Sequence, residues 1–356
     1  MRTFMFFFLL SGILASCTSS TGEHEIYEKE YTSINLKYAQ FFRLKQKGNE
    51  FLLQLLDPDT KKVVQSVVIS EEKNPRIICL TATLTGMFCE LNQRNFLIGV
   101  SAENQLYDNQ LKQAFRSGKV QEYGDFAQLS LERIADAQPN VILYNFVNTD
   151  FPQKEKLEKL GVKMLIVNDW LEAHPLAKAE WIKVIGAMTG QYKKSCDLFD
   201  KIEAKYLQIA ERVNGFETHP TVISGNLIGG NWYAPSGENY FGLLIKDAGG
   251  DYRYKDTKGQ KSLSLPLEKI LKDNEETEVW LNPGVSKWNQ LLQLNPHAEL
   301  LSPSESGEIY CYSAHMNKFW EESALRADFV LEDLAHIFHP DMDVDYTFHY
   351  YSKLKK

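Results

Sequence analysis

From Gln191 to Val213 an apolar side chain recurs every three or four residues, and neither Gly nor Pro interrupts the run before Asn214-Gly215. This spacing gathers the apolar side chains on one face of a single α-helix. At ~1.5 Å per residue the helix would be roughly 35 Å long, enough to reach from one folded body to another. We therefore expect two bodies joined by this helix. Its apolar face consists of Tyr192, Cys196, Phe199, Ile202, Tyr206, Ile209 and Val213.

The chain on either side of this helix alternates short apolar strands with amphipathic helices. The strands before it are "RIICLT", "FLIGVS", "NVILYN" and "VKMLIVN", and those after it are "PTVISGN", "VWLNPG" and "IYCYS". Such alternation is typical of mainly parallel sheets with helices on both faces. Residues 38–70 instead show apolar runs broken by turns at 47–49 and 57–59, which favours antiparallel strands. The predicted fold class is α/β: two Rossmann-like lobes with mainly parallel sheets joined by one long α-helix, plus a small N-terminal antiparallel β extension.

One short unit occurs once in each half of the chain. "SLERIADAQPNVILYN" starts at Ser130, and "PLEKILKDNEETEVWLN" starts at Pro266. Both read Leu-Glu-basic-Ile, then a polar break, then an apolar strand ending in Asn. Each glutamate, Glu132 and Glu268, would lie in the first turn of a helix, where the helix dipole favours a carboxylate. The repeat indicates equivalent faces of two similar lobes.

The N-terminus has the features of a secretory signal. Arg2 is followed by the short apolar stretch "FMFFFLLSGILASC". This stretch is shorter than the ~20 residues that a membrane-spanning helix needs. "LASC", ending at Cys17, resembles the lipobox of bacterial lipoproteins, which implies that Cys17 is lipidated and becomes the first residue. The alternative is a buried or disulfide-bonded Cys17 after ordinary cleavage. If Cys17 is lipidated, its acyl chains would attach the protein to a membrane, and residues 18–30 would be a polar tether.

Charge and cysteine content narrow the possible partners. The chain has 356 residues, 44% hydrophobic and 24% charged, with a net charge of −8, which argues against nucleic acid or an anionic membrane surface as a partner. Beyond Cys17 the cysteines show no C-x-x-C pair and no zinc spacing. Buried apolar thiols are favoured over a disulfide, which an oxidising compartment would permit. These cysteines are Cys79, Cys89, Cys196 and Cys311.

The order of segments resembles that of the helical-backbone (class III) periplasmic substrate-binding proteins of ABC importers, of the iron–siderophore and cobalamin type. The resemblance is carried by "RIICLTATLTGMFCELNQRNFLIGVS", "YGDFAQLSLERIADAQPNVILYN", "LEKLGVKMLIVND", "KDAGGDY" and "ADFVLEDLAHIFHP". Asn140 stands where Asp is usual, and Ala327 where Pro is usual. The strands before Arg76 and the run "DWLEAHPLAKAEWIKVIGAMTG" are similar to a lipoprotein subgroup with an extended N-terminus. The resemblance covers the chain after the tether.

This resemblance implies a function and partners. The protein would be an extracytoplasmic, lipid-anchored monomer that captures a chelated iron (siderophore or haem) or a corrinoid and delivers it to an ABC permease dimer with its ATPase. It would catalyse no reaction and hold no cofactor of its own, although its ligand could contain iron or cobalt. Glu132 and Glu268 would dock on arginines of the permease subunits. The alternative for each glutamate is an ordinary helix start with a nearby Lys or Arg partner.

The ligand is expected beyond the carboxyl ends of the strands, where the loops of the two lobes face each other. "GGNWYAPSG" places Trp232 and Tyr233 on a loop, where aromatic rings can stack on a bulky ligand. Packing under a loop is the alternative for both. Lys318 and His315 could meet an anionic group or a metal. The predicted ligand-binding residues are Thr81, Thr83, Tyr107, Trp232, Tyr233, Asn282, His315, Lys318 and Trp320.

Three other functions remain as alternatives. A receptor for a bare metal ion would need several His and carboxylate ligands converging from separate loops. The histidines fall in unrelated contexts, so no metal-ligating residue is assigned. A lipid-anchored enzyme would need a nucleophile or cofactor motif, and the sequence contains no G-x-S-x-G, no P-loop and no H-E-x-x-H. A surface interaction protein with the same two lobes is the third.

The predicted division of the chain follows from these segments. It comprises a signal peptide at 1–16, a lipidated tether at 17–37, the β extension at 38–72, the N-terminal lobe at 73–175, a helical linker at 176–215, the C-terminal lobe at 216–340 and a C-terminal tail at 341–356.

Overall fold

The first lobe is built on a five-stranded parallel sheet in the order β7-β6-β5-β8-β9. The computed structural model describes residues 30–69, 75–124, 129–145, 154–312 and 318–355. Alternate residues of β5 face opposite sides, so Ile77 and Cys79 enter one buried cluster and Ile78 the other. The sheet is thus buried on both faces, as the strand composition predicted. Its strands are β5 (Ile77–Cys79), β6 (Leu97–Val100), β7 (Gln121–Glu122), β8 (Val141–Tyr144) and β9 (Lys163–Ile166), and its helices α2 (Ala82–Glu90), α3 (Asn109–Arg116), α4 (Leu131–Ala137) and α5 (Lys154–Lys159).

The second lobe repeats this plan with the sheet order β13-β10-β15-β16-β17, in which β17 alone runs antiparallel. A small antiparallel sheet, β11-β12-β14, accompanies it. The strands are β10 (Thr221–Ser224), β11 (Asn226–Ile228), β12 (Asn231–Ala234), β13 (Asp251–Tyr252), β14 (Leu263–Pro266), β15 (Val279–Leu281), β16 (Ile309–Cys311) and β17 (Ser352–Lys353). The helices are α9 (Tyr240–Asp247), α10 (Leu267–Asp273), α11 (Trp288–Leu294), α12 (Pro303–Ser306) and α13 (Phe319–Glu322).

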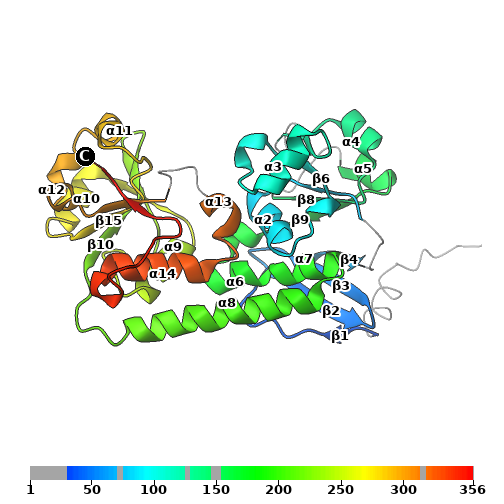
Figure 1. Cartoon of the computed structure of the whole chain (residues 1–356), viewed down its shortest axis with the longest axis horizontal. Helices are drawn as coiled ribbons and strands as arrows, with labels where there is room; N and C mark the ends of the chain where they lie inside the picture. The colour runs from blue at the N-terminus through cyan, green and yellow to red at the C-terminus, as the bar shows by residue number, and fades with distance from the viewer. Residues whose placement is uncertain (1–29, 70–74, 125–128, 146–153, 313–317, 356) are drawn as a thin grey trace, which may run out of the picture.

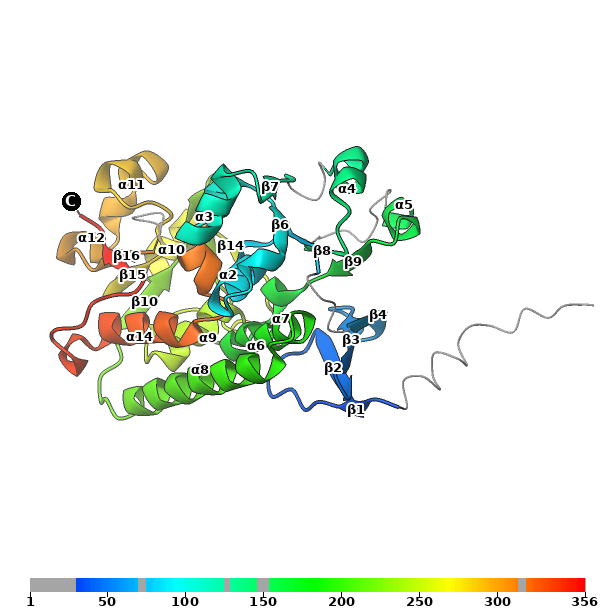
Figure 2. The same cartoon turned by 45° about the vertical axis from the view of Figure 1, so that its right-hand side comes forward.

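A layer of helices runs beneath both lobes, and its longest member is α8 (Tyr192–Val213). Figures 1 and 2 show α8 as one unbroken rod that extends from the first lobe to the second. The predicted apolar face is confirmed, because Phe199, Ile202 and Tyr206 are buried along it. The other helices of this layer are α6 (Pro175–Glu180), α7 (Ile182–Met188) and α14 (Ala327–Phe338). The connection between the lobes is therefore a packed helical layer.

The predicted N-terminal extension is an antiparallel sheet in the order β1-β2-β3-β4. It covers the edge of the first lobe's sheet, since Gln65 Nε2 of β4 donates to the carbonyl of Met164 in β9 at 2.6 Å. Buried Glu180 accepts hydrogen bonds from the backbone N–H groups of Tyr38 and Ala39, each at 2.9 Å. These bonds fix the extension to the helical layer. Its strands are β1 (Thr32–Ser33), β2 (Phe42–Lys47), β3 (Glu50–Leu56) and β4 (Val63–Ile69).

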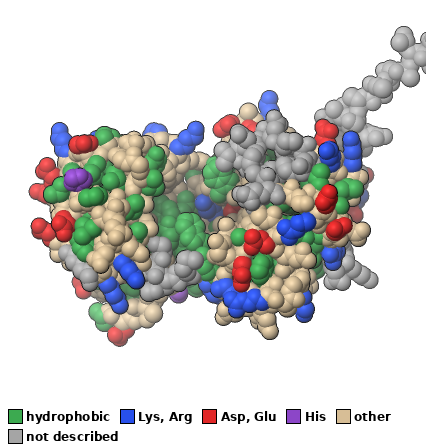
Figure 3. Space-filling model, turned by 90° about the horizontal axis from the view of Figure 1, so that it is seen from above, with side chains coloured by type: hydrophobic (Ala, Val, Ile, Leu, Met, Phe, Trp, Pro, Cys, Tyr) green, Lys and Arg blue, Asp and Glu red, His purple; other side chains and the backbone are tan. Residues whose placement is uncertain are grey.

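Seen from above, the two lobes enclose a hollow whose walls carry many hydrophobic side chains (Figure 3). No helix among the described ranges is both long enough and apolar enough to cross a membrane. The predicted fold class is confirmed in its two lobes, its long helix and its N-terminal sheet.

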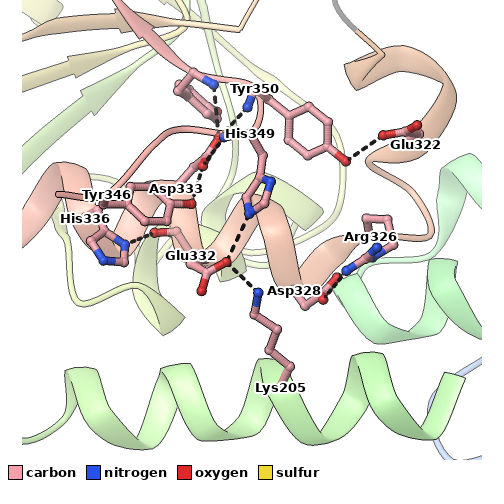
Figure 4. Close-up of polar contacts among 11 residues, drawn as sticks. Lys205, Glu322, Arg326, Asp328, Glu332, Asp333, His336, Tyr346, His349 and Tyr350 are labelled. Atoms are coloured by element: carbon pink, nitrogen blue, oxygen red, sulfur yellow. Dashed lines mark hydrogen bonds and ion pairs between the residues drawn. The ribbon is translucent and has the colours of Figure 1, made fainter. Parts of the chain in front are cut away.

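The C-terminal segment 341–356, expected to be a tail, instead contributes β17 to the second lobe's sheet. Its path is set by Asp333 of α14, whose carboxylate is fully buried. This carboxylate accepts bonds from the Tyr346 hydroxyl at 2.6 Å and from the Tyr350 N–H at 2.7 Å (Figure 4). On the same helix, Glu332 binds Lys205 of α8 at 2.6 Å. The last residues thus tie the second lobe to the helical layer.

Candidate ligand-binding cleft

The cleft between the lobes has α6 as its floor, because α6 contacts α9 of the second lobe and the 3-10 turn Asp169–Leu171 that follows the first lobe's sheet. His174 caps α6, its ring nitrogen Nδ1 accepting from the N–H of Leu176 at 3.1 Å, and Pro175 occupies the first helical position. The loops at the carboxyl ends of both sheets open above this floor. This placement agrees with the ligand position expected for open α/β sheets.

A cavity of about 330 Å³ opens on the second-lobe side of this cleft. Four aromatic side chains line it, and two of them are exposed: Tyr233 at 41% and Trp320 at 54%. Tyr312 packs edge-on against Trp320, with 5.5 Å between ring centroids. Phe241 is the fourth. Trp320, held in place by other rings, and Tyr233 form an exposed surface for a flat or bulky apolar group.

Polar groups share the wall of the cavity. Asn282 follows β15 with a positive φ of 59°, and its buried Oδ1 has no hydrogen-bond partner among the described residues. Asn226 and Asn239 lie on the same wall. A buried amide oxygen without a donor costs free energy. The predicted cleft residue Asn282 lines the cavity, and its amide also interacts with the buried hydroxyl of Tyr351.

The first lobe contributes the start of α2 and the loop before α3. Thr81 is buried, and its carbonyl accepts from the Thr85 hydroxyl at 2.8 Å. Thr83 donates its hydroxyl to Asp169 Oδ2 at 2.6 Å. Tyr107 is half-buried, and its N–H donates to Glu321 Oε2 of the second lobe at 3.0 Å. Thr83 thus belongs to the cleft floor, and Thr81 supports α2 from within. Tyr107 joins the two lobes through its backbone N–H.

Trp232 does not face the cleft. The segment predicted as a loop is a hairpin, β11 and β12 joined at Gly229-Gly230, and strand alternation turns successive side chains to opposite faces. Trp232 is fully buried, and its indole N–H donates to the carbonyl of Ser224 at 3.1 Å. Its neighbour Tyr233 is the one exposed. The assignment of Trp232 as a ligand contact is therefore corrected to a core residue.

The remaining predicted residues are divided between the rim and the outer faces. Lys318 pairs with Glu322 at 2.9 Å, and this hydrogen bond raises the pKa of the lysine. His315 lies outside the described residues.

Glu132 and Glu268 are both exposed, each in the first turn of a seven-residue helix, α4 and α10 respectively. The isoleucine two residues further on, Ile134 or Ile270, is buried. Neither carboxylate has an ion-pair partner among the described residues, so the repeated unit has the same form in both lobes.

Two charged residues, Lys178 and Asp169, lie on the floor of the cleft, and neither was among the individual ligand-binding residues predicted from the sequence. Lys178 of α6 lies with its Nζ 4.4 Å from the ring centroid of Tyr240, and burial lowers its pKa. Burial has the opposite effect on Asp169, which is 1% exposed: it raises the pKa of the carboxyl group. Trp170 is 40% exposed beside them. No sequence pattern marked Lys178.

Within the part of the chain that the structure describes, no group of three or more His, Cys, Asp and Glu side chains could hold a metal ion. No disulfide joins any two of the described cysteines, and burial raises the pKa of both Cys79 and Cys89. The cleft thus combines aromatic surface, amides and one floor lysine.

Comparison with known proteins gives matches in sequence and in structure. A family model described as periplasmic binding protein matches residues 77–312. An uncharacterized lipoprotein of Methanocaldococcus jannaschii is 23% identical over 341 residues, covering 91% of this chain and 80% of that protein. A periplasmic haem-binding protein from Pseudomonas aeruginosa superposes with a TM-score of 0.60 at 15% identity, over 79% of this chain and 98% of that one. A petrobactin-binding protein from Bacillus subtilis gives 0.57 at 14% identity, over 76% and 95%. At these identities the structural matches show a common fold.

Proposed function

This chain belongs to the periplasmic binding protein family, and we propose that it serves an ABC importer, capturing a chelated iron or a corrinoid in the cleft between its lobes. The iron would arrive as a siderophore complex or as haem. The observation that supports this most directly is the cavity of about 330 Å³ lined by Tyr233, Phe241, Tyr312 and Trp320.

Aromatic rings suit such ligands for a physical reason. Siderophore complexes, haem and corrinoids present wide, rigid and partly apolar faces. Stacking such a face on exposed Trp320 and Tyr233 would remove a large apolar area from water on both sides. The ring of Trp320 is already held by Tyr312 and Phe319, with 5.5 Å and 5.6 Å between ring centroids. Little side-chain freedom would therefore be lost on binding.

Delivery requires attachment and docking as well as capture. In this proposal Cys17 carries the lipid that holds the protein on the outer side of a membrane. Exposed Glu132 and Glu268, one on each lobe, would contact arginines of the two permease subunits, whose ATPase drives import. Because the two carboxylates belong to different lobes, their separation would report whether the cleft is occupied. No chemical step is assigned to any residue.

A ligand-binding screen tests this function. Purified full-length protein in detergent micelles is titrated with a ferric tricatecholate, ferrioxamine B, haemin and cyanocobalamin, with Zn²⁺ and Mn²⁺ as bare ions, while tryptophan fluorescence is recorded. Saturable quenching at 1:1 stoichiometry by one of the chelates or corrinoids, with the ligand recovered unchanged, is the expected result. Saturation by a bare ion alone would favour the metal-ion receptor. Multiple turnover would favour an enzyme, and no saturation by any ligand would overturn the proposal.

A further inference from the structure

Lys178 is the floor residue that contacts both lobes. It projects from α6, and its Nζ donates to the backbone carbonyl of Trp170 at 3.2 Å, on the first-lobe side. The same Nζ lies 4.4 Å from the centroid of the Tyr240 ring, on the second-lobe side. Tyr240 is flanked in the chain by Asn239 and Phe241, which line the aromatic cavity. The ammonium group therefore lies against the first turn of α9, whose Phe241 lines the cavity.

The hydrogen-bonding capacity of this ammonium group is only partly used. A lysine ammonium has three N–H donors, and the Trp170 carbonyl is the one acceptor found for Lys178 among the described residues. Some lysines of the fold pair with a carboxylate, such as buried Lys183 with Glu180 at 2.7 Å. No carboxylate of the described residues lies within ion-pair distance of Lys178. A half-buried cation without an anionic partner is costly, unless a ligand supplies one.

The nearest acidic group does not fill this role. Asp169 influences the charge of Lys178 from beyond ion-pair distance. One of its oxygens accepts the hydroxyl of Thr83 at 2.6 Å, and the other is buried without a partner among the described residues. Burial raises the pKa of this carboxyl group, which favours its neutral form. Asp169 and Glu172 attract the ammonium group without pairing with it, so the Trp170 carbonyl remains its one acceptor among the described residues.

We propose that Lys178 binds an anionic oxygen of the ligand, a carboxylate or a phenolate, while the aromatic cavity takes the ligand's apolar face. This inference rests on the proposed function and narrows its substrate class to negatively charged chelates. A ligand held in this way would touch the floor and the second lobe together. Neutral or cationic chelates of similar size would lack the floor contact.

Binding by charge variants tests the assignment. Full-length wild-type protein, Lys178→Met, Lys178→Arg and the surface control Lys193→Met are titrated in detergent micelles. The probes are two anionic compounds, a ferric tricatecholate and haemin, and two without net negative charge, ferrioxamine B and cyanocobalamin. Lys193 is on α8 with 89% of its side chain exposed, so its removal controls for net charge alone. Circular dichroism and thermal unfolding verify that each variant is folded. If Lys178→Met does not fold, Lys178→Gln, which retains a donor for the Trp170 carbonyl, replaces it.

The expected result is that wild-type protein binds an anionic probe and that Lys178→Met weakens this binding by more than about tenfold. Lys178→Arg should stay within about threefold, and Lys193→Met should match wild type. Unchanged affinity in Lys178→Met, or binding of only the probes without negative charge, would overturn the role of Lys178 and leave the proposed function standing. Binding of none of the four probes by wild-type protein would overturn the proposed function and this inference with it.

Discussion

Gly86 of the first lobe lies directly against the backbone carbonyl of Glu321 of the second lobe. A Cβ atom built on Gly86 would overlap that oxygen. The contact brings α2 and α13 together, and α13 also carries Trp320 of the ligand cavity. Glu321 strengthens the junction, since its carboxylate accepts the N–H groups of Tyr107 at 3.0 Å and Asp108 at 2.9 Å. Helix α13 is therefore a bridge between the lobes.

Replacing Gly86 with Ala should loosen this bridge. The methyl group would force α2 away from α13, at a cost of about 1–3 kcal/mol in the free energy of unfolding, partly offset by the better helix propensity of Ala. Urea unfolding measures the loss. Gly215→Ala is the control, because its added Cβ would lie 3.3 Å from the Arg212 carbonyl and replaces no contact between lobes. Equal stability of Gly86→Ala and wild type would show that the two helices can separate freely.

The pH dependence of stability should report the buried carboxyl group of Glu321. Burial raises its pKa from 4.5 to about 7. The folded state therefore binds a proton that the unfolded state has released between these pH values. The stabilisation is complete below pH 4.5 and is lost as the pH rises to about 7, on the order of 2–3 kcal/mol. Urea unfolding at pH 5 and pH 8 measures the difference.

Two substitutions separate the contributions to this pH dependence. Glu321→Gln can keep an acceptor for the two N–H groups and removes the titrating group, so it should flatten the slope. Glu172, buried beneath the N-terminal extension, also has its pKa raised by burial to about 7. Glu172→Gln should reduce the pH dependence of the free energy of unfolding by a similar amount, and the double variant should reduce it more than either single variant. A wild-type slope in Glu321→Gln would contradict the assignment.

Ligand affinity should depend on Trp320 and not on Trp232. Trp320→Ala removes an exposed ring of the cavity, and we expect at least a tenfold weaker affinity for the chelate that binds in the fluorescence screen. Isothermal titration measures it, because the substitution removes a fluorophore. Leu300→Ala, at a 65% exposed residue that does not line the cavity, should leave affinity unchanged. Trp232→Phe should lower the melting temperature and change affinity by less than a few-fold. The reverse order for the two tryptophans would refute this division of roles.

Reversing the charge of both docking glutamates should stop uptake without changing ligand affinity. Glu132→Lys together with Glu268→Lys would repel the arginines expected on the permease. Cells carrying the double variant should lose import of the iron or cobalt label. Glu155→Lys with Glu305→Lys is the matched control, because both are exposed glutamates in the first turn of short helices, one in each lobe. Normal uptake by the first pair would leave Glu132 and Glu268 as ordinary surface residues.

Lipid attachment should depend on Cys17. Cys17→Ala should move the protein from the membrane fraction to the soluble fraction after cell lysis, because the acyl chains would be absent. Detergent phase partitioning with immunoblotting detects the change. Cys196→Ala, at a half-buried thiol of α8, is the control that should remain with the membrane. Membrane retention of Cys17→Ala would exclude the proposed anchor.

Local patterns in the sequence were sufficient for the elements and the class of fold. The three-and-four spacing in α8, the apolar strands of both sheets and the turn at Gly48 each report a short-range preference. The same holds for the repeated helix start at Glu132 and Glu268. Such patterns are readable because periodicity alone tells which side of an element is buried.

The cleft depends on contacts that join residues far apart in the chain. Trp232 and Tyr233 are neighbours of similar chemistry, yet only strand pairing determines that the first is buried beside Trp280 and the second is exposed. Lys178 gains its importance from Trp170 on one side and Tyr240 on the other. The sequence by itself determined the two lobes and the long helix between them. The tertiary structure decided which side chains meet between them, because burial, charge and hydrogen-bond partners there come from elements that no local period relates.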